Sequence, residues 1–127
     1  MAIKRKVPMD DGVAAVHAVR AALKSEDAAT SFAELSRPVR ATAVRFLLEE
    51  LATLAPGNSV EVRVPPFGVT QCVEGPRHTR GTPPNVVETD ALTWCSLALG
   101  TISWQDASAK VSASGLRSDL SDFLPVI

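Results

Sequence analysis

The residues best suited to chemistry in this sequence lie in one short basic segment. Arg77, His78 and Arg80 stand between Gly75 and Gly81, and prolines on both sides restrict the backbone. Arginine guanidinium groups donate paired hydrogen bonds to carboxylate and phosphate oxygens, so a loop of fixed shape here could bind an anion. An ordinary connection between two strands explains the same residues equally well. Both interpretations, an anion-binding loop and a purely structural loop, follow from the sequence.

Arg80 allows a direct test of the anion-binding hypothesis. We expect Arg80→Ala to weaken binding only of ligands with an anionic head group. The lost charge-assisted hydrogen bond costs on the order of 1.5–3 kcal/mol, and an uncharged analogue never made it. Binding titrations with a charged and an uncharged ligand of the same apolar chain measure the difference. Equal weakening of both would mean that Arg80 shapes the loop and does not contact the head group.

His78 also suggests an enzyme, because imidazole titrates near neutral pH and can act as a general acid or base. Glu74 or Glu88 would be its partner, and the arginines would hold a small anionic substrate. No serine-nucleophile motif, phosphate-binding loop or metal-binding spacing accompanies the histidine. Cys72 and Cys95 lie far apart without a CxxC motif, and we expect both as small core residues. The sequence thus predicts no catalytic residue with the support of a motif, no metal site and no cofactor.

The composition indicates one domain, residues 1–127, with nearly balanced charge. The sequence contains 13 Lys and Arg residues and 14 Asp and Glu residues. This balance argues against general electrostatic binding of nucleic acid. No apolar run approaches the roughly 20 residues of a membrane-spanning helix, and the N-terminus lacks the apolar core of a signal peptide. We therefore expect a cytoplasmic protein without nucleic-acid binding or stable membrane insertion. Residues 1–9, with their basic run at Lys4, Arg5 and Lys6, are expected to form a flexible tail.

Helical spacing of apolar residues and side chains that can cap a helix recur along the chain. The spacing predicts helices over three ranges: 10–23, 38–54 and 91–99. The predicted caps are Asp10 or Asp11 for the first helix, Ser36 for the second and Asp90 for the third. On the first helix, the predicted buried face consists of Val13, Val16, Val19 and Leu23. Residues 25–30 are predicted to be a connection, and Ser31 with Glu34 has the spacing of a capping box.

Three arginines, Arg37, Arg40 and Arg45, follow one another along the second predicted helix. They could form a basic face that binds phosphate. Because Glu49 and Glu50 come directly after them, a solvated face with both charges is the better interpretation.

Strands are predicted where apolar residues alternate with polar ones. The ranges are 59–64, 67–73, 85–89 and 111–113. The first two should pair antiparallel, with a bulge or a wide corner at Pro65-Pro66, because two prolines are not a favoured hairpin turn. The C-terminal residues are too apolar for a free end and should dock on the core or close over a cavity.

The second half of the sequence resembles a known family. The segment NVVETDALTWCSLALGTISWQDASAKVSASGLRSDLSDFLPVI is similar to the C-terminal half of the sterol carrier protein fold. That half runs through a strand, a capping Asp, a short helix, a Gly, a second short helix ending near an Ala, a strand, a Gly and a final leucine-containing helix. The matching positions here are Asp90, Gly100, Ala107, Gly115 and Leu120. With VRVPPFGVTQCVEGPRHTRGTPPNVVETD included, the chain after about residue 35 resembles a small standalone bacterial branch of this family.

The resemblance implies an α+β domain with a mixed or mostly antiparallel sheet of four to five strands. Helices would cover one face of the sheet, over an apolar cavity for lipid-like ligands. The leading hypothesis is therefore a non-catalytic binding or carrier protein for a small apolar or amphipathic molecule. Its candidate ligand-binding residues are Phe67, Arg77, His78, Arg80, Trp94, Leu120, Phe123 and Leu124. For each apolar residue of this set, a place in the ordinary core is the alternative. A third hypothesis is a module that binds a protein partner, or forms a homo-oligomer, through its apolar C-terminus.

Overall fold

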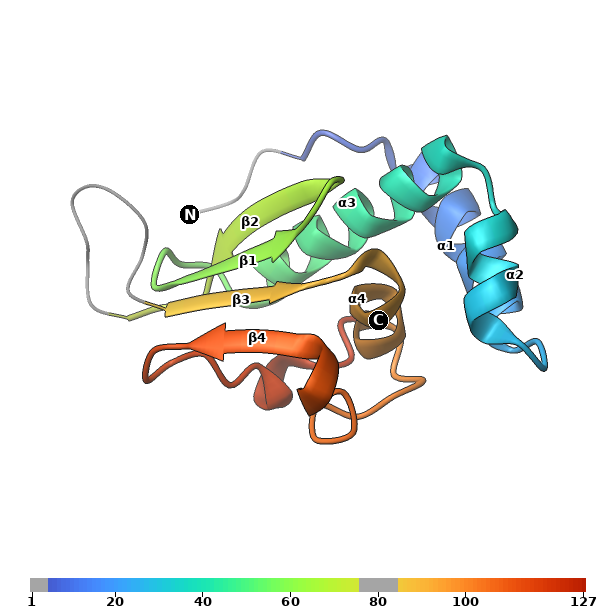
Figure 1. The fold of residues 1–127 in the computed structure, drawn as a ribbon. Helices are drawn as coiled ribbons and strands as arrows, with labels where there is room; N and C mark the ends of the chain where they lie inside the picture. The colour runs from blue at the N-terminus through green and yellow to red at the C-terminus, as the bar shows by residue number, and fades with distance from the viewer. Residues whose placement is uncertain (1–4, 76–84) are drawn as a thin grey trace.

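Four strands form one mixed sheet in the computed structural model, which describes residues 5–75 and 85–127. The strands are β1 (Val60–Val64), β2 (Gly68–Cys72), β3 (Asn85–Thr89) and β4 (Val111–Ser114), in the spatial order β2-β1-β3-β4. β1 pairs antiparallel with β2 and parallel with β3, and β3 pairs antiparallel with β4. Helices α3 (Arg37–Leu54) and α4 (Ala91–Ala98) lie on one side of this sheet (Figure 1). The expected α+β fold, a mixed or mostly antiparallel sheet of four to five strands covered on one face by helices, is confirmed as a four-stranded mixed sheet.

The alternation of side chains along β1 decides which face of the sheet is covered. Val60, Val62 and Val64 are fully buried, whereas Glu61 and Arg63 point to the other face. This alternation confirms the strand prediction, and the register of β2 confirms the antiparallel pair. The predicted wide corner is wrong. Residue Val64 pairs with Gly68 across a tight turn that contains a cis peptide between Pro65 and Pro66, and the Phe67 N–H donates to the Val64 carbonyl oxygen at 2.9 Å.

Two helices begin at the predicted caps. The Ser36 hydroxyl accepts the Val39 N–H at 3.3 Å at the start of α3. The Asp90 carboxylate accepts the Thr93 N–H at 2.8 Å and the Thr93 hydroxyl at 2.9 Å at the start of α4. Gly100, with φ of +79°, follows the end of α4 in a conformation that other residues rarely adopt.

The first helix, α1 (Met9–Leu23), packs on α3 beyond the end of the sheet (Figure 1). The predicted cap is wrong, because Pro8 precedes the helix and Asp10 and Asp11 lie inside its first turn. Carboxylates in the first turn interact favourably with the helix dipole and stabilise the helix. The predicted face is also shifted, since Val13 is 55% exposed. Its buried side is made largely of small residues: Gly12, Ala15, Val16, Val19 and Ala22. A Cβ on Gly12 would lie 2.1 Å from the Phe46 ring, so glycine allows the close approach of the two helices.

A short helix, α2 (Ala28–Glu34), replaces the connection predicted over residues 25–30. Asp27 caps it by accepting the Thr30 N–H at 3.1 Å and the Thr30 hydroxyl at 2.7 Å. These two hydrogen bonds lower the pKa of the Asp27 carboxyl. The capping box expected at Ser31 is therefore wrong, and Phe32 is the residue that buries this helix against the core.

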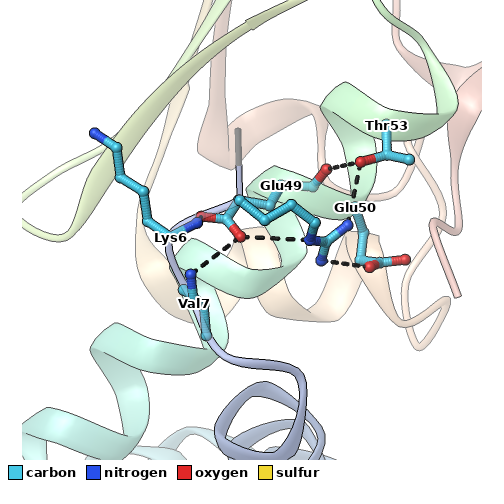
Figure 2. A network of polar contacts seen from close by, with 6 residues as sticks. Lys6, Val7, Glu49, Glu50 and Thr53 are labelled. Atoms are coloured by element: carbon cyan, nitrogen blue, oxygen red, sulfur yellow. Dashed lines mark hydrogen bonds and ion pairs between the residues drawn. The ribbon is translucent and has the colours of Figure 1, made fainter. Parts of the chain in front are cut away.

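The N-terminal segment lies along α3 and is held there by two glutamates (Figure 2). The Arg5 guanidinium donates to Glu50 at 2.6 Å and to Thr53 at 3.1 Å. Glu49 accepts the backbone N–H groups of Lys6, at 2.9 Å, and Val7, at 3.3 Å. We expected a flexible tail over residues 1–9. Residues 1–4 lie outside the described part of the chain, and residues 5–7 are held by these contacts.

The C-terminal segment docks on the core, as its apolar composition predicts. The side chains of Leu120 and Val126 are buried, and the Val126 N–H donates to the Ala98 carbonyl oxygen of α4 at 2.9 Å. The two short helices implied by the resemblance in this half are single 3₁₀ turns, Ser108–Lys110 and Ser121–Phe123. Across residues 5–75 and 85–127, no helix is long and apolar enough to cross a membrane.

Candidate functional site

The proposed anion-binding residues Arg77, His78 and Arg80 lie outside the described residues, but the two ends of their segment are described. Ser59, which precedes β1, connects these ends. Its hydroxyl donates to the Val73 carbonyl oxygen at 2.6 Å, and its own carbonyl oxygen accepts the Asn85 side-chain amide at 2.7 Å. The chain therefore leaves the sheet and returns to it at positions that one buried serine fixes.

Val73 has a backbone conformation that a β-branched residue rarely adopts, with φ of 65°. Its N–H donates to the Ala55 carbonyl oxygen at 2.7 Å, and its carbonyl oxygen accepts the Ser59 N–H at 3.1 Å. A Cβ on Gly57 would lie 2.2 Å from the Val73 oxygen, so glycine is needed where the two segments cross. These contacts hold the strained residue at the end of β2, directly before the basic segment.

A partly enclosed surface pocket of about 330 Å³ lies where the C-terminal segment meets the end of α4. We call it the C-terminal pocket. Its lining residues are Leu97, Gly100, Ile102, Ser103, Trp104, Gln105, Ser121, Leu124 and Pro125. The volume falls in the range of small-molecule sites, roughly 300–1,000 Å³. Apolar side chains dominate the lining and none of the lining residues is charged, so this pocket suits an apolar or uncharged group.

Among the candidate ligand-binding residues that the structure describes, Leu124 alone lines the C-terminal pocket. Trp94 and Leu120 are each 1% exposed and belong to the main core. The Trp94 indole N–H donates to the Val44 carbonyl oxygen of α3 at 3.3 Å, so the indole fills the space between α4 and α3. Phe123 is partly buried against the same core. The structure thus places Trp94 and Leu120 in the core, Phe123 against it and Leu124 at the pocket.

Phe67 lies at the turn between β1 and β2, against the side of α3 that carries the arginines. Its side chain is 6% exposed. The guanidinium carbons of Arg37 and Arg40 lie 5.2 and 6.0 Å from the centre of its ring. The Arg45 Nε–H donates to the Phe67 carbonyl oxygen at 2.7 Å. Phe67 also lines a shallow pocket of about 490 Å³ on the uncovered face of the sheet.

Sequence reasoning missed the residues that make the C-terminal pocket apolar, Leu97, Ile102 and Trp104. Ile102 and Trp104 stand out in an otherwise polar segment after the helix stop at Gly100, and this was the available signal. Leu97 gave none, because α4 is apolar on almost every side and its pattern does not show which residue faces a pocket.

The enzyme hypothesis gains no residue from the described part of the chain. Glu74 and Glu88 are exposed, and His78 lies outside the described residues. Within residues 5–75 and 85–127, no group of three potential ligands is placed to hold a metal ion. Cys72 and Cys95 are fully buried free thiols, which confirms their expected place in the core. Burial raises the pKa of each thiol to about 12, with Asp90 adding to the effect at Cys95, so neither is a reactive thiolate near neutral pH.

A family model described as bacterial SCP ortholog matches residues 36–126, which cover most of the chain from the cap of α3 to the C-terminal segment. No curated protein matches the sequence. The matched range includes the sheet, α4, the basic segment and all residues of the C-terminal pocket.

Proposed function

Because the chain belongs to the sterol carrier protein-like family of bacterial SCP orthologs, we propose that it is a non-catalytic carrier of a small apolar or amphipathic ligand. The observation that carries the proposal is the C-terminal pocket, with its apolar and uncharged lining. Such a pocket releases water when an apolar chain enters, and burial of apolar surface contributes about 25 cal/mol for each Å². The proposal includes a cytoplasmic location, which rests on the sequence alone.

The C-terminal segment forms one wall of the pocket and is not part of the sheet. Leu124 and Pro125 line the pocket from this segment, and Val126 attaches it to α4 by one backbone hydrogen bond. Ile127 remains 51% exposed. A ligand longer than the pocket would displace this segment from Ala98 and reach the core around Trp94 and Leu120. We therefore keep these two residues and Phe123 as contacts of a fully inserted ligand.

Tryptophan fluorescence tests this proposal, because the chain contains two tryptophans and no tyrosine. Trp104 lines the pocket and Trp94 is buried in the core. We expect decanol to change the emission in a saturable way, since it replaces water beside the Trp104 indole. Trp104→Phe should abolish the change, and Trp94→Phe should preserve it. The opposite result would place the ligand beneath α4, and the absence of any saturable binding of decanol or decanoate would refute the carrier proposal.

A matched pair of variants controls for general loss of surface hydrophobicity. Ile102 lines the pocket, whereas Leu116 is fully exposed. Ile102→Gln should weaken decanol binding about tenfold, because it removes a large part of the apolar contact with the ligand. Leu116→Gln should leave the affinity unchanged. Native mass spectrometry of the purified protein gives an independent measurement, as a copurifying ligand would be lost in Ile102→Gln alone.

The proposal also includes an anionic head group on the ligand. Arg77, His78 and Arg80 would hold it, and support for this comes from their residue types and from the fixed ends of their segment at Ser59. The Arg80→Ala comparison of charged and uncharged ligands is its test. For the protein-partner and homo-oligomer hypotheses, most of the apolar C-terminus already packs on its own chain, which leaves Ile127 as the exposed apolar side chain of that segment.

A further inference from the structure

The arginines of α3 are exposed or half-buried, as the expected solvated face requires, and two of them also contact an aromatic ring. Arg37 and Arg40 are three positions apart, so they lie on the same side of the helix. Both guanidinium groups are within 6.0 Å of the centre of the Phe67 ring, which comes from the turn between β1 and β2. The Phe67 ring is itself held in place by burial and by the hydrogen bond from Arg45 to its carbonyl oxygen. A rigid aromatic ring therefore positions two cationic side chains.

The described hydrogen bonds leave most N–H donors of these two arginines available. A guanidinium group carries five N–H donors. Arg40 uses its Nε–H for the Leu35 carbonyl oxygen, at 3.2 Å. Among residues 5–75 and 85–127, no carboxylate lies within ion-pair distance of Arg37 or Arg40. Arg5 and Arg63 differ in this respect, because each contacts a glutamate at 2.6 Å.

The neighbouring charges do not neutralise the pair. Arg45 adds a third positive charge, since its Nε–H donates to the Phe67 carbonyl oxygen. Glu61 is the acidic residue of β1 nearest the turn, and its carboxylate is bound by Arg63. Glu34, three positions before Arg37, is exposed at the end of α2 and is not within ion-pair distance of either arginine. The net charge around Phe67 is therefore positive.

The geometry points to a binding site for a phosphate group, as inorganic phosphate or a phosphate ester, at Arg37 and Arg40. Two planar guanidinium groups can donate to more than the two oxygens of a carboxylate. A tetrahedral phosphate presents at least three oxygens and therefore matches them better. The cation–π contacts with Phe67 limit the freedom of both side chains before the ligand arrives, which lowers the entropy lost on binding. Arg37 is exposed, so the rest of a phosphate ester can extend from the site into solvent. This site is separate in its residues from the C-terminal pocket and does not depend on the carrier proposal.

Binding of phosphate to the full chain and to charge-matched variants tests the inference. Titration calorimetry with inorganic phosphate, and sedimentation with vesicles of phosphatidylglycerol or of phosphatidylcholine, are the measurements. We expect saturable binding of free phosphate or of the phosphatidylglycerol vesicles. The double variant Arg37→Gln/Arg40→Gln should weaken it at least about tenfold, since charge-assisted hydrogen bonds are lost. Arg37→Gln alone, at an exposed position, should weaken it in the same direction if the double variant does not fold.

Arg63→Gln is the control, because it removes one positive charge from a residue that is already paired with Glu61. It should leave phosphate binding unchanged, against a clear loss for Arg37→Gln. Binding of free phosphate would identify a soluble ligand, and binding of anionic vesicles alone would identify a phospholipid head group. Equal losses in Arg63→Gln and Arg37→Gln would show that net charge alone attracts the anion and would overturn the inference. The absence of binding to phosphate and to both kinds of vesicle would overturn it as well.

Discussion

Replacing Trp94 by alanine is expected to lower the free energy of unfolding by about 3–5 kcal/mol, the usual cost of deleting a large buried aromatic side chain. The indole is 1% exposed and lies in the core cluster with Leu47, Leu51 and Leu120. The substitution also removes the hydrogen bond from the indole N–H to the Val44 carbonyl oxygen. Chemical denaturation of the variant, followed by circular dichroism, measures the change. Trp94→Ala should thus be among the most destabilising single substitutions in this protein.

Two further variants separate the loss of the buried Trp94 side chain from the effect of any large-to-small substitution. Leu54→Ala, at a residue of α3 that is 58% exposed, should change stability by less than about 1 kcal/mol. Trp94→Phe keeps an aromatic ring and should cost less than Trp94→Ala. A small apolar probe such as benzene should stabilise Trp94→Ala more than the natural protein, because the deleted side chain leaves an apolar cavity between α4 and α3. A loss for Trp94→Ala no larger than that of Leu54→Ala would contradict the packing described here.

Those parts of the fold that depend on local rules could be predicted from the sequence. The alternation around Val62 gave β1 and its buried face, because adjacent side chains of a strand point to opposite faces. Ser36 and Asp90 marked the starts of α3 and α4, because an N-terminal N–H group of each helix needs an acceptor. The turn at Pro65-Pro66 could not be predicted in this way, because two prolines are not a favoured hairpin turn and the residue types do not fix the length of the connection.

The wrong predictions in the N-terminal part come from tertiary contacts. The Val13 position follows the helical spacing, but α1 turns its small residues toward α3 because Gly12 must approach Phe46. The seven residues of α2 show too short a pattern to be recognised, and burial of Phe32 is what stabilises this helix. In both cases, contacts with residues distant in sequence determine the structure, and local patterns do not show such contacts.

The candidate site was harder to predict than the fold, because an apolar residue looks the same in a filled core and in a pocket wall. The sequence pattern around Trp94 and Leu120 fits a cavity lining as well as it fits the filled core in which these residues lie. The grouping of Arg37 and Arg40 on Phe67 joins α3 to a turn about thirty positions away, so spacing along one helix could not reveal it. The residues of the C-terminal segment gave a usable signal, because an apolar chain end must dock on the core. Ile102 and Trp104 gave another, because they are apolar residues in a polar segment.

Replacing Asn85 by leucine is expected to destabilise the protein by about 2–4 kcal/mol, because two polar groups lose their partner in a buried setting. The Asn85 side chain is 5% exposed. Its amide donates to the Ser59 carbonyl oxygen at 2.7 Å, and its side-chain oxygen accepts the Arg117 N–H at 2.9 Å. Leucine has a similar size and satisfies neither group. Thermal and chemical denaturation measure the loss.

The same substitution should also affect ligand binding through the basic segment, since Asn85 is the residue at which residues 76–84 rejoin the sheet. If that segment holds a charged head group, Asn85→Leu should weaken binding of decanoate more than binding of decanol, measured where both proteins remain folded. Asn58→Leu is the matched control, because Asn58 is exposed and no described side-chain hydrogen bond involves it. It should change neither stability nor the preference between the two ligands. Equal destabilisation by Asn58→Leu and Asn85→Leu would show that the two hydrogen bonds of the Asn85 side chain contribute little. An unchanged preference in Asn85→Leu would separate the basic segment from the ligand.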